Sequence, residues 1–171
     1  VKQRPDQTDP LLAKGEGPGT LPAGGAPRRV VIFTMFIDSA RHLAQELAKA
    51  FGANTVMLAI DKQQGDIKDD LDLSKVKLVH ATSSVNTCFD VKADPKNIWD
   101  APRILVTTDK FSEGVNLNRA GLMVNYDIPW NPVRIIQRLG RFNRINACWF
   151  KTIHAYNLYP EYQRADGHGK P

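Results

Sequence analysis

Short apolar runs alternate with helical stretches along most of this chain. The first run, at 30–33, is continuous and apolar, as in a strand that is buried on both faces. Similar runs predict five more strands, at 56–60, 76–80, 103–107, 122–126 and 152–158. Buried strands separated by helices indicate a mostly parallel sheet with helices on both faces, which is an α/β fold. Which of the strands 56–60 and 76–80 lies nearer the centre of the sheet stays open.

The first helix is predicted directly after the first strand. Asp38 or Ser39 can cap its N-terminus, and Gly52 can end it. Between these limits, apolar residues recur at steps of three and four, as one buried face of a helix requires. They are Ala40, Leu43, Ala44, Leu47 and Phe51.

Another helix is predicted to begin near Pro132. Asn131 is a good N-cap, and proline suits the first helical position because its missing N–H would have no partner there. Steps of three along this helix place three apolar residues toward the core. They are Val133, Ile136 and Leu139.

Residues 1–27 differ from the rest of the chain. They contain five of the 11 prolines and five of the 12 glycines, which predicts a flexible linker or loop. We expect one globular lobe at 28–165 and a disordered tail at 166–171. Residues 83–102 are interpreted as a loop or insertion with a single turn after Asp94. Because the first residue is Val rather than Met, we expect a piece of a longer protein.

The composition narrows the class of protein. A chain of 171 residues with 42% hydrophobic residues fits one ordinary globular domain. No segment approaches the roughly 20 apolar residues of a membrane-spanning helix, so we expect no membrane partner and a cytoplasmic location. Cys88 and Cys148 lack the spacing of a zinc site or a disulfide framework, so no metal ligands are expected. The net charge of +5 is compatible with a polyanionic partner.

Positive charge is concentrated around the second predicted helix. Residues 131–151 contain five cations and neither Asp nor Glu. Gln137, Arg141 and Arg144 are spaced by four and three residues and share one helix face. Guanidinium groups are planar, permanently charged donors that match phosphate oxygens, so this face can bind a triphosphate. A solvated basic helix face explains the same spacing, and spacing alone does not decide between the two interpretations.

A second candidate site follows the strand at 103–107. Thr107 and Thr108 lie at the carboxyl end of this strand, where open α/β sheets place their ligands. Gly114 lets the backbone approach a ligand closely. A strand followed by an ordinary capped turn is the alternative interpretation.

The segment 137–144, QRLGRFNR, resembles motif VI of superfamily 2 helicases. In that family the last two arginines of the motif are fingers that reach the γ-phosphate across a cleft, and here they are Arg141 and Arg144. Gln137 stands where the family also contacts the γ-phosphate. Phe142 departs from the usual pattern, which more often has an aliphatic residue there, and we expect the difference to affect helix packing.

The segment 104–117, ILVTTDKFSEGVNL, resembles motif V of the same family. The resemblance implies that Thr107 and Thr108 contact the nucleic-acid backbone. It also implies that Gly114 and Asn116 face the nucleotide. Glu113, in the same turn, is expected beside the nucleotide, where it would couple the nucleotide site to the nucleic-acid site.

A third segment, 30–43, resembles motif IV. This resemblance assigns a nucleic-acid backbone contact to Thr34, whereas Phe33 is expected in the core. The three motifs occur in the family's order and cover about residues 28–160. The segment 125–132, NYDIPWNP, which precedes motif VI, is most similar to bacterial Swi/Snf-like ATPases. Within it, Trp130 is expected to anchor packing.

The resemblance implies the C-terminal lobe of a superfamily 2 helicase, with a RecA-like three-layer sandwich and a mostly parallel sheet. The chain contains no phosphate-binding loop of the Walker type. ATP with Mg²⁺ is therefore expected to be bound mainly by an N-terminal RecA-like lobe of the same protein. The complete protein would be an ATP-hydrolysing helicase or translocase on DNA, with double-stranded DNA favoured and RNA as an alternative. The isolated chain is expected to be inactive.

Two other functions stay open at this stage. The first is a degenerate, non-catalytic helicase lobe that docks nucleic acid or protein. The second is a stand-alone nucleotide-binding α/β domain. Arg134 lies a turn before Gln137, so Arg134→Lys is the comparison that sequence alone suggests for Arg141→Lys.

Overall fold

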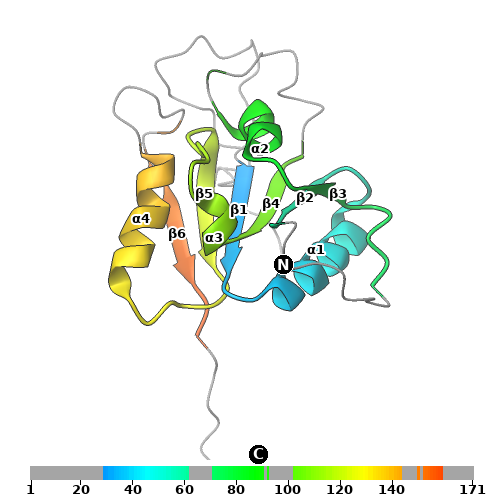
Figure 1. Ribbon diagram of the computed structural model, residues 1–171, viewed down its shortest axis with the longest axis horizontal. Coiled ribbons are helices and arrows are strands. Elements are labelled where there is room, and N and C mark those ends of the chain that lie inside the picture. Colours follow the sequence, from blue (N-terminus) through cyan, green and yellow to red (C-terminus); the bar gives the residue numbers. More distant parts are fainter. Residues whose placement is uncertain are drawn as a thin grey trace, which may run out of the picture.

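Six parallel strands form a single sheet. The computed structural model describes residues 29–61, 71–90, 92, 102–143, 150 and 152–159. The strand order is β3-β2-β4-β1-β5-β6, and all neighbouring strands run parallel (Figure 1). The strands are β1 (Arg29–Thr34), β2 (Val56–Ala59), β3 (Lys77–Val79), β4 (Ile104–Thr108), β5 (Ala120–Asn125) and β6 (His154–Asn157). All six predicted strands are confirmed.

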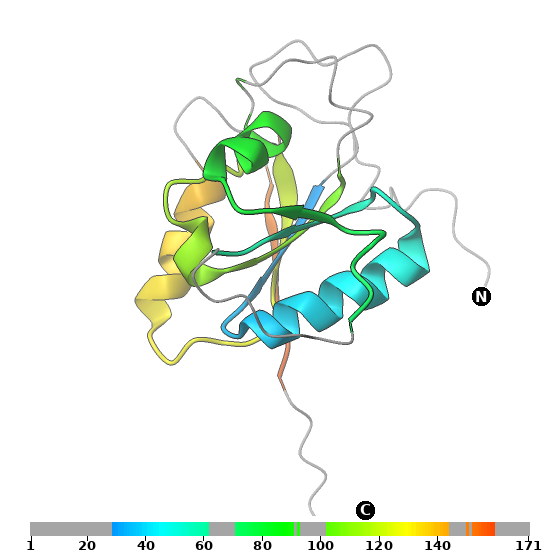
Figure 2. The ribbon, with the colours of Figure 1, turned by 45° about the vertical axis from the view of Figure 1, so that its right-hand side comes forward.

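Helices cover both faces of this sheet and make three layers (Figure 2). The helices are α1 (Ile37–Phe51), α2 (Thr82–Phe89), α3 (Asp109–Ser112) and α4 (Pro132–Phe142). Alanines of α1 pack on one face, where Ile32, Leu58 and Val106 point. Residues of α2, α3 and α4 pack on the other face around Phe33 and Leu105. The expected three-layer α/β sandwich is confirmed.

The order of the strands answers the question that the sequence left open. β2 lies inside the sheet between β3 and β4, and β3 forms one edge. Lys77 and Leu78 of β3 are exposed, as suits a short edge strand. β1 lies between β4 and β5, and its last residue, Thr34, is paired with Thr108 of β4. The carboxyl ends of these two central strands therefore meet.

The first helix begins and packs slightly differently from the prediction. α1 starts at Ile37 with Phe36 as its N-cap, and no side chain caps it, so neither Asp38 nor Ser39 has that role. Gly52 ends the helix as predicted, with a positive φ of 93° that favours glycine. Phe51, the last residue of α1, is largely exposed rather than packed, whereas Ala48 and Leu47 before it pack on the sheet.

Helix α2 lies in the region that was expected to be a loop. The prediction was wrong because five of its eight residues are Thr, Ser or Asn, which are weak helix formers in isolation. Val85, Cys88 and Phe89 occur at steps of three and four and are buried against the sheet. Tertiary packing of this short apolar face stabilises the helix despite its poor intrinsic propensity. The expected turn after Asp94 lies outside the described residues.

Helix α4 has the predicted start, but a different set of its residues faces the core. The Asn131 side chain accepts a hydrogen bond from the Val133 backbone N–H at 3.0 Å, which confirms the cap. Val133 and Ile136 point outward, and Ile136 is 66% exposed, so their expected burial was wrong. The fully buried residues are instead Arg138 and Phe142. Leu139 is partly buried against the core.

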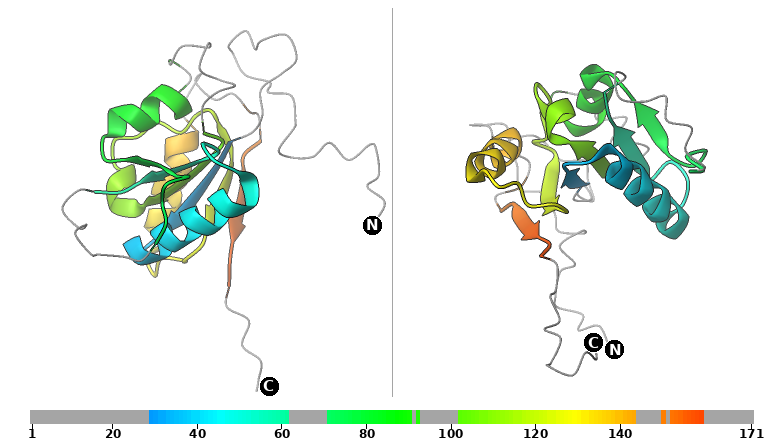
Figure 3. Two further views of the ribbon diagram at one scale, coloured as in Figure 1. Left: turned by 90° about the vertical axis from the view of Figure 1, so that its right-hand side faces the viewer. Right: turned by 60° about the horizontal axis from the view of Figure 1, so that its bottom comes forward.

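The carboxyl ends of the strands come forward in the right-hand view of Figure 3, with α1 and α4 on opposite sides of them. Trp130, just before α4, is 99% exposed and so does not anchor packing. No helix in the described part of the chain is long and apolar enough to cross a membrane. The predicted linker at 1–27, the tail at 166–171, Arg144 and Cys148 lie outside the described residues.

Candidate functional site

A buried ion pair joins α4 to α3. The Arg138 guanidinium donates from Nε to Asp109 Oδ1 at 2.6 Å and from Nη2 to Oδ2 at 2.7 Å. This two-pronged geometry is the strongest form of an arginine–carboxylate contact. Arg138 is only 2% exposed and Asp109 17% exposed. Because a buried charge is costly without a partner, this pair fixes how α4 packs against α3.

Side chains of the sheet also contact Arg138. Its Nη1 donates to Asn125 Oδ1 at 2.5 Å, and its guanidinium lies 4.9 Å from the centre of the Phe33 ring. Asn125 in turn donates to Asn157 Oδ1 of β6 at 2.7 Å. The Phe33 ring also packs against Phe142, with centroids 6.4 Å apart. Arg138 of α4 thus contacts α3, β1 and β5 directly, and Asn125 links it to β6.

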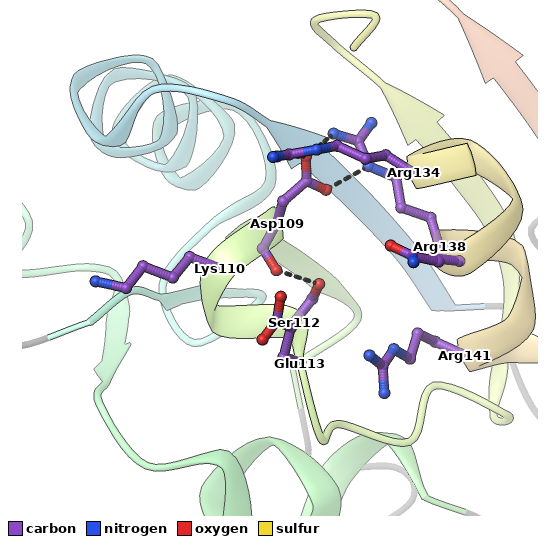
Figure 4. Close-up of a pocket in the computed structure, with 8 residues that line it drawn as sticks. Asp109, Lys110, Ser112, Glu113, Arg134, Arg138 and Arg141 are labelled. Carbon is purple, nitrogen blue, oxygen red and sulfur yellow. Dashed lines mark hydrogen bonds and ion pairs between the residues drawn. The ribbon is translucent and has the colours of Figure 1, made fainter. Parts of the chain in front are cut away.

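A pocket of about 360 Å³ opens between α3 and α4 beside this pair. Its lining is mostly charged, and it consists of Asp109, Lys110, Ser112, Glu113, Arg134, Gln137, Arg138 and Arg141. Arg134 and Arg138 reach Asp109, whereas Arg141 lies farther along α4, on the side of Glu113 (Figure 4). The structure therefore brings together Gln137, Arg141 and Glu113 from the two expected motifs.

Arg141 is the half-buried cation of this pocket that has no internal partner. Within the described part of the chain, no hydrogen bond or ion pair holds its guanidinium. Its backbone carbonyl is fixed, since it accepts from the Leu117 N–H at 3.0 Å. Gln137 is exposed one turn earlier. Arg144 lies outside the described residues, so its predicted place on this face stays a prediction.

The turn after α3 is fixed from α2. Gly114 has a positive φ of 86°, a conformation that other residues rarely adopt. The Asn116 backbone N–H donates to Asn86 Oδ1 at 2.9 Å, and its side-chain amide donates to Asp90 Oδ2 at 2.6 Å. Asn116 Oδ1 is buried and has no hydrogen-bond partner among the described residues. This oxygen is enclosed by the protein and does not line the pocket between α3 and α4.

The hydrogen bonds that Asp90 accepts from this turn also lower the pKa of its carboxyl. Burial acts to raise the pKa of the Asp90 carboxyl, but hydrogen bonds from the Asn116 side chain, the Lys92 backbone and the Asn118 side chain outweigh it. The pKa of Asp90 therefore lies below its ordinary value. The carboxylate form is the one that holds the Asn116 turn in place.

The three threonines expected to contact nucleic acid do lie together at the carboxyl edge of the sheet. Thr34 and Thr108 are paired residues of β1 and β4, and Thr107 precedes Thr108. All three are buried. The Thr107 hydroxyl donates to the Ala59 carbonyl at 3.0 Å, and the Thr34 hydroxyl donates to Asp127 Oδ2. No described residue accepts a hydrogen bond from the Thr108 hydroxyl, which leaves it the most available of the three.

Two residues of this site were missed from the sequence. Asp109 follows the two threonines directly and was not among the predicted site residues, although an acid at a strand end beside a basic helix is a usable signal. Arg138 was not selected because its position lies about 100° from Gln137 around the helix axis. The structure places it under the pocket, where it holds Asp109.

Comparison with known proteins finds similarity to helicases over part of this chain. Residues 75–146 match the family model of the helicase conserved C-terminal domain. The uncharacterized ATP-dependent helicase YqhH of Bacillus subtilis (strain 168) is 41% identical over 56 residues, which are 33% of this chain and 10% of that protein. The mitochondrial ATP-dependent RNA helicase MRH4 of Kluyveromyces lactis is 29% identical over 141 residues, 71% of this chain and 24% of that protein.

A solved structure agrees on the fold. The crystal structure of T. fusca Cas3 is similar with a TM-score of 0.52 and 17% sequence identity, covering 85% of this chain and 16% of that chain. This likeness supports the RecA-like α/β fold of the chain, and the sequence match to the helicase family model covers residues 75–146. The chain spans 10% and 24% of the two curated relatives.

The buried pair gives a first prediction about stability. Asp109→Asn should lower the free energy of unfolding by about 3 kcal/mol, because Arg138 would stay buried without a counter-charge. Lys110→Gln is the control, since Lys110 pairs with Asp61 at 3.2 Å on the surface and should contribute less than about 1 kcal/mol. Urea unfolding of each variant measures both values. Equal losses of unfolding free energy in the two variants would contradict the idea that the buried Arg138–Asp109 pair stabilises the fold.

The lowered pKa of Asp90 gives a second prediction, about pH. In the unfolded chain this carboxyl titrates near its reference pKa of about 3.9, and in the folded chain below it. Its contribution to stability should be complete above pH 3.9, roughly, and should be lost as the pH falls through the folded pKa. Asp90→Asn should flatten that acid limb in unfolding measured over a pH series. An unchanged limb would contradict the assignment.

Proposed function

We propose that this chain is the C-terminal, second motor lobe of an ATP-dependent helicase or translocase on nucleic acid, and that it supplies arginine fingers for ATP hydrolysis. The observation that carries the proposal is Arg141, a half-buried cation that lines a polar pocket without an internal partner. A structural arginine at this position would be paired, as Arg138 is. An unpaired arginine beside Gln137 suits an anion that comes from outside this lobe.

The chemistry assigned to Arg141 is stabilisation of negative charge. During hydrolysis, charge spreads over the oxygens of the transferred phosphoryl group, and a planar guanidinium can hold two of them at once. Arginine fingers contribute about 10³ to 10⁵ in rate in phosphoryl transfer generally. We assign the same role to Arg144, which stands three residues later on the same helix face by spacing. Gln137 is assigned a polar contact to the same phosphate.

The residues present fit the phosphates of ATP rather than the whole cofactor. The pocket offers guanidinium, ammonium and amide donors, and the chain has no Walker-type phosphate loop. ATP, when bound, supplies the phosphoryl group whose hydrolysis drives motion, and we assign most of its contacts and its Mg²⁺ to an N-terminal lobe. Glu113 lines the pocket from this chain, whereas Gly114 and Asn116 follow it in the same turn and are not part of the lining.

Nucleic acid is assigned to the carboxyl edge of the sheet. Thr34, Thr107 and Thr108 gather at the ends of the two central strands, and Thr108 connects directly to Asp109 of the pocket. Contacts of hydroxyl groups to backbone phosphates carry little base specificity, so binding should depend weakly on sequence. We favour DNA as the substrate, and double-stranded DNA in particular, because the segment 125–132 resembles Swi/Snf-like ATPases. RNA is the alternative, since one relative is described as an RNA helicase.

A docking module without catalysis is the second candidate. The outward apolar face that favours it consists of Trp130, Val133 and Ile136, all exposed. An intact phosphate loop in the preceding lobe distinguishes a motor from such a module, because a docking module does not need one. The isolated chain should release no phosphate from ATP under either candidate.

The third prediction tests the finger directly. In the complete protein, Arg141→Lys should lower nucleic-acid-stimulated ATP hydrolysis by at least about a hundredfold, because Lys keeps the charge but loses the planar fork. Nucleic-acid affinity and the free energy of unfolding should change little. Phosphate release, a binding titration and urea unfolding measure the three quantities, with the isolated chain as the blank.

The matched control for this prediction is Arg103→Lys. Arg103 is exposed at the start of β4, at the opposite end of the sheet from the pocket. Arg134→Lys does not serve, since the structure places Arg134 in the pocket itself. If Arg141→Lys kept the turnover of the control, α4 would be only a basic surface and the finger assignment would be wrong.

The fourth prediction concerns the strand end. Thr108→Val should weaken nucleic-acid binding by about tenfold, because one hydrogen bond to a charged phosphate is lost. Val keeps the β-branched shape, so the stability of the sheet should hold. Fluorescence titrations with several duplex sequences should show the same loss for each. Undiminished affinity in the complete protein would remove Thr108 from the nucleic-acid site.

A further inference from the structure

Arg134 shares the pocket with Arg141 but is held differently from Arg138. It stands seven residues before Arg141, so the two side chains leave α4 on nearly the same side, about 10 Å apart along the axis. Its side chain is 53% exposed. Among the described residues its side chain has one polar contact, from Nη1 to Asp109 Oδ2 at 3.5 Å, the outer limit of a hydrogen bond. Arg134 is thus loosely attached at the pocket wall.

Asp109 does not need Arg134. Both carboxylate oxygens already accept from Arg138, at 2.6 and 2.7 Å. If Arg134 moves away, Asp109 keeps two charge-assisted hydrogen bonds and no buried charge loses its partner. An exposed contact of this length contributes little to stability, so release of Arg134 is easy.

The charges of the pocket favour an anion in that space. Asp109 is offset by Arg138, and Lys110 is paired with Asp61 at 3.2 Å. The pocket charges that remain are the cations Arg134 and Arg141 against the single carboxylate of Glu113. Two flexible guanidinium groups on one side of a helix, with Gln137 between them, can surround a chain of phosphates.

We propose that Arg134 is a further phosphate-binding residue of this pocket: when the phosphate chain of a nucleotide enters, its guanidinium leaves Asp109 and binds that chain together with Arg141. The proposal rests on the proposed function, because it takes the nucleotide as the ligand of the α3–α4 pocket. Before the ligand arrives, the contact with Asp109 keeps Arg134 in the pocket. Sequence comparison with motif VI does not include Arg134, which precedes the motif.

The test uses the complete protein with ATP and with inorganic tripolyphosphate as a competitor. Arg134→Gln should lower kcat/KM for ATP by about tenfold, the equivalent of one charge-assisted hydrogen bond, and should weaken inhibition by tripolyphosphate. Arg134→Lys should recover part of both losses. The urea midpoint should stay at the wild-type value, since Arg138 keeps Asp109 paired. Arg103→Gln is the control with the same change of charge.

The outcomes separate this inference from the proposed function. If Arg141→Lys stops turnover while Arg134→Gln matches Arg103→Gln, the role of Arg134 is overturned and the finger stands. If the loss in Arg134→Gln comes with a lower urea midpoint and Arg134→Lys restores neither, Arg134 only supports structure and the inference fails. If neither Arg134 nor Arg141 affects turnover or inhibition by tripolyphosphate, the proposed function fails as well.

Discussion

The arginine buried beneath α4 is the constraint on which the candidate site depends. A guanidinium that is 2% exposed must find its counter-charge and its acceptors inside the protein, and Arg138 finds them on α3 and β5. Those contacts set the rotation of α4 about its own axis. With Arg138 turned inward, Gln137 and Arg141 border the pocket, and Val133 and Ile136 point to solvent. The position of the proposed finger therefore follows from the pairing of its neighbour.

Much of the fold follows from the sequence, because its signals are local. Continuous apolar runs predicted all six strands, and Asn131 and Gly52 mark real helix ends. The face of α4 could not be predicted by the same rule. Periodicity assigns charged residues to solvent, and only the tertiary partner Asp109 makes burial of Arg138 favourable. Helix α2 was missed for a related reason, since its stability comes from packing rather than from composition.

The candidate site was predicted in part. Sequence spacing selected Gln137 and Arg141, and the structure places both at one pocket with Glu113. Asp109 was not selected because its role appears only when α3 and α4 meet. The strand-end threonines are gathered as expected, yet two of their hydroxyl groups already have internal acceptors. Phe142, the departure from the family pattern, fills the core beside Phe33 and leaves the polar face of α4 unchanged.

The central claim is that Arg141 contacts a nucleotide held by another lobe. A crystal structure of the complete protein with ADP and a planar mimic of the transferred phosphoryl group tests it most directly. We expect Arg141 nitrogen atoms about 2.7 to 2.9 Å from oxygen or fluorine atoms of the mimic, with Arg138 still paired to Asp109. A structure in which the nucleotide and its mimic are fully bound while Arg141 points to solvent would contradict the account.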